Sequence, residues 1–240
     1  MEKGFEKKYH ALEDKHWWSC TRRELILTLM PVKNYDIKIL DLGCSSGALI
    51  RLLHKKNFAS VYGIDISKES MKACRKSKLK GILLGNATRL PVKNNSFDLI
   101  IASDILEHIE NDYGALNEWK RILKSGGHLI IFVPAFRFLW SSHDIINRHF
   151  RRYEKTSLKK LISKNNFKMI RIGHWNFLLF LPYTVINFLK GKNKKEDRLV
   201  ALNPILNGIL IKMLSFENFL IKKGVNFPFG ISLFVVLEKN

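Results

Sequence analysis

The chain has 240 residues, of which 46% are hydrophobic, 26% charged and 11% aromatic. This apolar content suffices for one sizeable core and excludes a disordered chain, which would be poor in aromatic and β-branched residues. Lys and Arg number 41 against 21 Asp and Glu, giving a net charge of +20 at pH 7. Such a charge attracts nucleic acid, anionic lipid headgroups or phosphorylated substrates, although it also suits a lysine-rich soluble protein.

The termini and the cysteines indicate the compartment. The segment 1–18 has no apolar stretch of the kind a signal peptide needs. The three cysteines, Cys20, Cys44 and Cys74, are an odd number without a C-x-x-C pair. These features argue against a disulfide scaffold and a cysteine zinc site, and we expect a reducing, cytoplasmic location.

The elements predicted in chain order are a helical cap followed by alternating strands and helices. The cap spans residues 1–35, with a helix over 5–30 that ends at Pro31. Strands are predicted at 37–42, 60–65, 81–85, 96–103, 127–133, 166–173 and 231–237. Helices are predicted at 47–56, 68–78, 112–123 and 157–165.

This alternation predicts an α/β fold with a Rossmann-like, mostly parallel seven-stranded sheet and helices on both faces. The core spans 36–173, a helical insertion spans 174–230, and the last strand, within 231–240, returns to the sheet. Ligands of such sheets bind beyond the carboxyl ends of the strands, so we expect the chemistry there.

The insertion 174–230 interrupts the alternation. Its apolar stretch 175–189 is too short for a membrane span and contains Pro182. Basic residues follow at Lys190, Lys192, Lys194, Lys195 and Arg198. A second, amphipathic helix is predicted over 203–223, with an apolar face of Leu206, Leu210, Met213, Phe216 and Leu220. Two interpretations remain open: a lid or dimer face, or a peripheral contact with anionic lipid on the inner face of the membrane.

The first motif is Asp41-Leu-Gly-Cys-Ser-Ser-Gly47, at the end of the first predicted strand. Its glycines, Gly43 and Gly47, let the backbone approach a ligand at a helix N-terminus. Ser45 and Ala48 break the dinucleotide pattern G-x-G-x-x-G, and Asp41 would attract an ammonium or sulfonium group. The motif resembles that of class I S-adenosylmethionine (SAM) dependent methyltransferases, an acidic residue followed by G-x-G-x-G, from which it departs at Ser45.

Asp65 ends the second predicted strand, 24 positions after Asp41. A carboxylate there can accept two hydrogen bonds from a ribose diol, or either Asp65 or Ser67 can cap the next helix. In the resembled family this acid holds the SAM ribose, and the next residue, Ile66, packs on the adenine.

Two further motifs extend the resemblance to residues 36–134. In Gly85-Asn-Ala-Thr-Arg-Leu-Pro91, Asn86 replaces the family's acid, and the resemblance places the Asn86 side-chain oxygen and Ala87 at the adenine. Residues 96–109 resemble the family motif that ends in L-E-H, which implies that Ser103, Asp104, Leu106 and His108 flank the methionine part of SAM and its methyl group. The four motifs are most similar to the ubiquinone-type, type 11 branch.

Residues 138–153 directly follow the fifth predicted strand and concentrate polar side chains: His143, Asp144, His149, Arg151, Arg152 and Tyr153. We expect an acceptor site in which His143 or His149 is a base and Arg152 holds an anionic group. Tyr153 and His108 complete the catalytic candidates, and a polar loop that caps the next helix is the alternative. No metal is expected, because no H-x-x-x-H or two-histidine-one-carboxylate spacing stands out.

The predicted function is methyl transfer from SAM to a small-molecule, lipid or lipid-linked glycan acceptor. Together with the upstream His16-Trp17-Trp18 and Arg22-Arg23, residues 138–153 resemble bacterial and archaeal methyltransferases of cell-surface glycan or lipid pathways. The first alternative is an RNA or DNA methyltransferase, which the charge suits, but Ser103-Asp104-Ile105-Leu106 stands where amino-group base methylases carry N-P-P-Y or D-P-P-Y. The second is a non-catalytic membrane-surface binding protein. The sequence leaves open whether the protein forms an oligomer.

Overall fold

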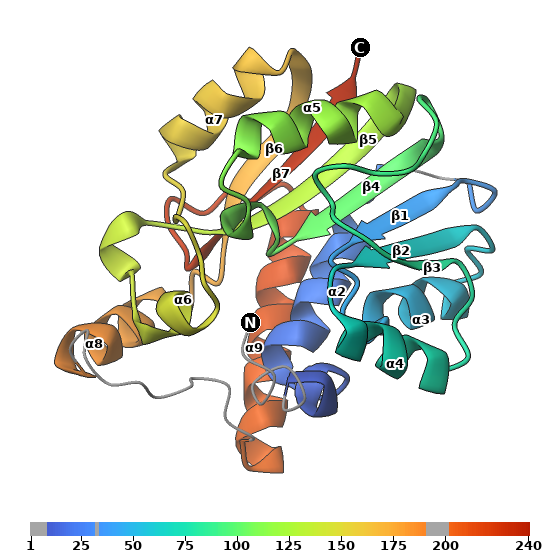
Figure 1. Cartoon of the computed structure of the whole chain (residues 1–240). Helices are drawn as coiled ribbons and strands as arrows, with labels where there is room; N and C mark the ends of the chain where they lie inside the picture. Colours follow the sequence, from blue (N-terminus) through green and yellow to red (C-terminus); the bar gives the residue numbers. More distant parts are fainter. Residues whose placement is uncertain (1–8, 32–33, 191–201) are drawn as a thin grey trace.

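The computed structural model describes residues 9–31, 34–190 and 202–240, and its centre is a seven-stranded sheet (Figure 1). The strands are β1 (Ile39–Leu42), β2 (Val61–Asp65), β3 (Ile82–Leu84), β4 (Phe97–Ser103), β5 (Leu123–Pro134), β6 (Phe167–Trp175) and β7 (Ser232–Lys239). Their order is β3-β2-β1-β4-β5-β7-β6. Strands β1 to β5 are parallel, whereas β7 is antiparallel to both β5 and β6. The predicted mostly parallel Rossmann-like sheet is confirmed.

Helices cover both faces of the sheet (Figure 1). On one face lie α5 (Asp112–Ile122) and α7 (Lys155–Lys164). On the other lie α2 (Trp17–Leu29), α3 (Ala48–Lys55), α4 (Lys68–Lys76) and α9 (Pro204–Lys222). The short α6 (Ser142–Ile146) and α8 (Phe180–Lys190) lie at the end of the sheet where the parallel strands finish. Two 3₁₀ turns, Leu106–His108 and Arg137–Leu139, follow β4 and β5.

The core is divided by the sheet into two apolar clusters. One includes Leu116 and Trp119 of α5 and Leu158 of α7. The other includes Leu25 of α2 and Leu214 of α9. All four residues of β1 are buried, which explains why the central strands are continuous apolar runs in the sequence.

The predicted single helix over 5–30 is wrong within the described residues. A short helix over 9–13 ends in a turn, and α2 begins only at Trp17. The backbone N–H groups of Lys15 and His16 both donate to the carbonyl of Leu12, and His16 has an extended backbone. The break turns the 9–13 segment toward the sheet, where Glu13 binds the loop after β1.

The predicted apolar face of α9 is also wrong. Leu206 and Phe216 are exposed, and the buried positions are Leu214, Glu217, Asn218 and Ile221. Two polar side chains fix this rotation. The Glu217 carboxylate accepts the N–H groups of 176, 177 and 178, and the Asn218 side chain accepts the indole N–H of Trp175 at 2.9 Å. By length and composition α9 could cross a membrane, but its second half belongs to the core.

Candidate functional site

A cavity of about 2130 Å³ opens at the carboxyl ends of the parallel strands. Its walls come from the N-terminal helices, the loops after β1, β2, β3 and β4, the segment after β5, and α8. Ligand pockets commonly measure about 300–1,000 Å³. This cavity therefore has space for a nucleotide-sized ligand and a second molecule, and it lies where the topology of the sheet predicts ligand binding.

The loop after β1 is shaped by left-handed backbone conformations. Gly43, Ser45 and Gly47 have φ values of 69°, 51° and 78°. Only glycine adopts this region without steric cost, so Ser45 is strained where the family motif has glycine. Its amide donates to Asp65 at 2.9 Å and its hydroxyl to Glu13 at 3.0 Å, and these bonds hold the strained turn. Gly47 begins α3 and, unlike Gly43 and Ser45, does not line the cavity.

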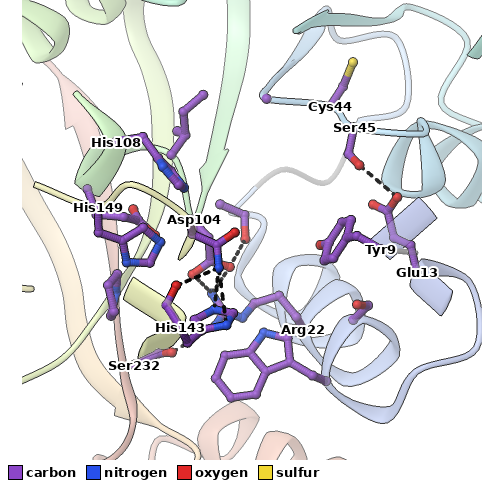
Figure 2. A pocket seen from close by; sticks show the side chains of 18 of the residues that line it. Tyr9, Glu13, Arg22, Cys44, Ser45, Asp104, His108, His143, His149 and Ser232 are labelled. Carbon is purple, nitrogen blue, oxygen red and sulfur yellow. Dashed lines mark hydrogen bonds and ion pairs between the residues drawn. The ribbon is translucent and has the colours of Figure 1, made fainter. Parts of the chain in front are cut away.

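Three carboxylates converge on this end of the cavity. Asp41 lies near the end of β1 and Asp65 ends β2. Glu13 reaches the loop after β1 from the N-terminal helix, where it accepts the Ser45 hydroxyl (Figure 2). Burial, followed by the charges of Glu13 and Asp65, raises the pKa of Asp41 well above its usual range. Burial likewise raises the pKa of Glu13, although the hydroxyls of Ser46 and Ser45 donate to it. A positive charge placed here would relieve this mutual repulsion.

Asp65 and Ile66 both line the cavity. The two Asp65 oxygens accept the amides of Ser45 at 2.9 Å and Ser67 at 2.8 Å. These bonds fix the carboxylate at the cavity wall, while Ser67 caps α4 through its own hydroxyl. Ile66 is 74% exposed and lines the cavity, so its apolar surface is available to a flat ring.

The predicted role of the Asn86 oxygen is not supported by the structure. That oxygen accepts both the amide and the hydroxyl of Thr88, each at 2.9 Å. A carbonyl oxygen has two lone pairs, so neither is left for an adenine amino group. Asn86 and Ala87 do line the cavity, and the Ala87 carbonyl accepts the buried Trp119 indole N–H.

The middle of the cavity holds the buried Arg22, which the sequence resemblance included only as half of the Arg22-Arg23 pair. Arg22 of α2 is 3.0 Å from Asp104 and donates to Ser232 at 2.9 Å (Figure 2). Its guanidinium carbon is 4.4 Å from the ring centroids of both Phe132 and Trp175. Arg22 follows Trp18 by one helical turn, and its guanidinium carbon is 5.1 Å from the Trp18 ring centroid. Ser103, at the end of β4, lines the cavity and donates to Asp104 at 3.2 Å.

Histidines gather at the far end of the cavity (Figure 2). The rings of His108 and His149 meet edge to face at 4.5 Å, and His143 lies 6.0 Å from His149. Burial and the neighbouring His149 lower the pKa of His108 to about 4, so His108 is neutral at pH 7. Burial and the charge of Asp104 raise the pKa of the adjacent Glu107 well above its usual range.

Asp144 orients His149 within this histidine group through a hydrogen bond. Its fully buried carboxylate is 2.9 Å from His149 Nδ1 and 2.8 Å from Arg152 Nε. Burial alone would raise the pKa of Asp144, but His149 and Arg152 outweigh it and hold it below its usual range. The remaining nitrogen of His149, Nε2, is left for other partners.

Two predicted acceptor residues have other partners. Arg152 lines the cavity, but its guanidinium donates to Asp144, the Ala135 carbonyl and the Tyr183 hydroxyl. It is therefore a structural cation rather than an available clamp for an anion. Tyr153 lies outside the cavity, is buried, and donates to Asp112 at 3.1 Å. Leu106 is also a core residue that does not line the cavity.

The chain is similar to methyltransferases in sequence and in structure. Residues 40–131 match the family model described as a methyltransferase domain. The chain is 35% identical over 160 residues to an uncharacterised protein of Methanocaldococcus jannaschii, covering 66% of each chain. It is 33% identical over 134 residues to the ubiquinone/menaquinone biosynthesis C-methyltransferase UbiE of Wigglesworthia glossinidia brevipalpis, covering 50% of this chain and 53% of the relative. These matches thus leave a third to a half of each relative uncovered.

A solved structure extends the similarity to almost the whole chain. A protein in complex with the Trm112 methyltransferase activator of Haloferax volcanii superposes with a TM-score of 0.66 at 18% identity, covering 98% of this chain and 94% of that one. At this identity the likeness concerns the fold. Together with the domain match and the arrangement of the motifs along the sheet, it leads to one conclusion: the chain belongs to the class I SAM-dependent methyltransferases.

Proposed function

We propose that the protein transfers a methyl group from SAM to a small-molecule or lipid-linked acceptor. The observation that carries the proposal is the convergence of Glu13, Asp41 and Asp65 on one end of a cavity large enough for two ligands. The charges of these carboxylates contribute to the raised pKa of Asp41, so the site favours a cationic ligand. When bound, SAM supplies a methyl group activated on a positively charged sulfonium.

In the cofactor half of the cavity, defined by the loops after β1, β2 and β3, each residue has a distinct role. Glu13 and Asp41 attract the positive charges of SAM. Asp65, fixed by two backbone amides, accepts the ribose hydroxyls, and the exposed side chain of Ile66 packs on the adenine. Gly43 gives the loop its left-handed turn, and Ser103 borders the methionine part from β4.

In the acceptor half, defined by Arg22, residues 104–108, residues 142–152, α8 and Ser232, the second substrate lies beside His108 and His149. Asp144 holds the His149 ring so that Nε2 is presented to this space. Positioning of the two reactants supplies most of the rate enhancement in such a reaction, up to about 7–11 kcal/mol of the barrier. An oxygen acceptor also gains from a group that removes or stabilises its proton.

The exposed apolar surface of α8 favours a lipid-linked acceptor. Pro182, Tyr183 and Ile186 line the cavity. On the same helix Phe188 and Leu189 are 87% and 77% exposed. One helix thus connects an apolar outer surface with the acceptor half, as an interfacial helix that collects a lipid-linked substrate would. The predicted basic residues Lys192, Lys194, Lys195 and Arg198 lie outside the described residues.

Transfer of label from methyl-labelled SAM tests the proposal. The protein is incubated in parallel with lipid extract, glycan extract and RNA. We expect label in a lipid or glycan fraction, and we expect His149→Ala to lose transfer while it keeps its affinity for SAM. Label in RNA alone would contradict the acceptor class, and absence of SAM binding would contradict the function.

Liposome co-sedimentation tests the lipid contact separately. Binding to anionic vesicles at low salt should fall when Phe188 and Leu189 are both replaced by serine, because interfacial binding depends on buried apolar area. The matched control is Leu83→Ser together with Leu84→Ser, two exposed apolar side chains on β3. Equal sedimentation of the wild type, the α8 variant and the β3 variant would contradict a lipid contact by α8, and the helix would then serve as a lid over the cavity.

A further inference from the structure

Three side chains in the acceptor half form a group with the composition of a metal site. The donor atoms of Glu107, His108 and His149 all lie within 4.8 Å of one another, and all three residues line the cavity. Two imidazoles and one carboxylate are a donor set that suits divalent transition-metal ions and leaves coordination positions open. The sequence did not suggest this set, because His149 is far from the Glu107-His108 pair in the chain.

Glu107 lacks a partner that its environment requires. The residue is 1% exposed, and its Oε2 atom is buried without a hydrogen-bond partner. A buried polar oxygen without a hydrogen-bond partner is costly. The 3₁₀ turn that carries it is held in place, because the Phe150 amide donates to the Glu107 carbonyl at 2.8 Å. That bond ties the His149-Phe150 segment to the turn, so the three donors are fixed relative to one another.

His149 is oriented for binding through a single nitrogen. His149 Nδ1 is bonded to Asp144 at 2.9 Å, and Asp144 is held in turn by Arg152 at 2.8 Å. This leaves His149 Nε2 as the donor that faces Glu107 and His108. A metal-binding histidine typically bonds a carboxylate through its second nitrogen, which fixes the tautomer and the ring. Arg152 and Asp144 are therefore positioning residues for this site.

We propose that Glu107, His108 and His149 bind a divalent transition-metal ion at the acceptor end of the cavity. The ion gives the Glu107 carboxylate its missing partner, and its open positions face the cavity. This deepens the proposed function and rests on it in one respect: the acceptor presents an oxygen donor, such as a hydroxyl, to the ion. Metal-bound oxygen ligands lose protons more readily than free ones, so the ion would lower the pKa of the acceptor hydroxyl, whose proton would pass to solvent water.

The test is metal binding by the full chain, measured without any reaction. Protein stripped with a chelator is titrated with Co²⁺ while its visible absorption is recorded, and Zn²⁺ is then added as competitor. We expect one Co²⁺ per chain, displacement by Zn²⁺, and no binding of Mg²⁺ at the same concentration, because imidazole nitrogen suits the transition metals better than Mg²⁺.

Variants at the site are compared with matched variants elsewhere. Glu107→Gln and His149→Ala should weaken Co²⁺ binding by more than the roughly 10- to 100-fold that loss of an outer-shell partner costs. Glu69→Gln on α4 and His54→Ala on α3 lie outside the cavity lining, and both variants should bind Co²⁺ as the wild type does. SAM affinity, measured on every variant, shows that each is folded.

The outcomes separate this inference from the proposed function. SAM binding without Co²⁺ binding, or equal Co²⁺ binding by Glu107→Gln, His149→Ala and the wild type, overturns the metal site and leaves the methyltransferase. Co²⁺ binding that depends on Glu107 and His149 in a protein that does not bind SAM supports the metal site and overturns the proposed function.

Discussion

The two halves of the cavity are built in different ways. The cofactor half comes from the loops at the ends of adjacent parallel strands, so residues 41–87 form most of it in chain order. The acceptor half joins side chains from distant segments, including Arg22, His108, His149, Tyr183 and Ser232. Sheet topology therefore specifies the first half, whereas long-range side-chain bonds specify the second.

The halves also differ in how their charges are balanced. Glu13, Asp41 and Asp65 stand together at the cofactor end. In the acceptor half the buried Arg22 and Arg152 already pair with Asp104 and Asp144. The cofactor end is thus prepared for a cationic ligand. The acceptor end holds its arginines in internal pairs, and the large positive charge of the chain does not by itself make this end a site for anions.

Replacing Asp144 should have the largest effect on stability. Asp144→Ala leaves the buried Arg152 without its partner, and breaking a buried ion pair typically costs about 3–5 kcal/mol. The free energy of unfolding in urea should fall by that amount. The control is Lys72→Ala, which removes the exposed pair with Glu69 and should cost at most about 1 kcal/mol. Equal losses would show that Asp144 does not organise the acceptor half.

Gly43→Val tests the cofactor half through its affinity for SAM. The position has φ +69°, and an added Cβ would come within 2.8 Å of the Ile105 side chain. Backbone strain of this kind costs about 1–3 kcal/mol, and the side chain also protrudes where the cofactor must approach. SAM affinity should fall below detection by calorimetry. Gly208→Ala, a helical glycine with nothing within 4 Å, should bind SAM normally.

The difference between the halves explains what the sequence could predict. The ends of β1 and β2 follow from apolar runs and motifs, so Asp41, Gly43, Asp65 and Ile66 were predicted and all line the cavity. The seven-stranded sheet followed from the same alternation. Local patterns suffice where neighbouring strands bring consecutive motifs together.

Long-range pairing is what the sequence could not specify. Arg152 was predicted to hold an acceptor, but Asp144 and Tyr183 take its donors. The oxygen of Asn86 is likewise used by Thr88. The face of α9 is set by buried Glu217 and Asn218, two polar residues that a hydrophobic pattern assigns to solvent. In each case the deciding partner is a specific polar contact and not a periodicity.

A smaller, pH-dependent effect on the free energy of unfolding is expected from Glu118, which binds the loop after β3. Glu118 accepts the amide of Leu90 at 2.7 Å and pairs with Arg121. The hydrogen bond from Arg121 lowers the pKa of Glu118. Because this pKa is depressed on folding, its stabilisation is present above the unfolded value of about 4.3 and is lost as the pH falls through the folded value.

Glu118→Gln should therefore destabilise the protein at pH 7 by about 1 kcal/mol or less, since the pair is partly exposed. The difference from the wild type should shrink as the pH falls below about 4.3. Urea unfolding at a series of pH values measures it. A difference that stays constant with pH would mean that the lost contribution is packing and not charge.

The central claim is that the cofactor half binds SAM through the carboxylate at the end of β2, and calorimetric titration with SAM tests it most directly. Asp65→Asn keeps the shape of the side chain but removes its charge, and a hydrogen bond to a charged group contributes about 1.5–3 kcal/mol. We predict that SAM binds the wild type and Asp36→Asn, a change at an exposed carboxylate, with the same affinity, and Asp65→Asn roughly 10- to 100-fold more weakly. Equal affinity of all three proteins, or no binding to the wild type, would contradict the claim.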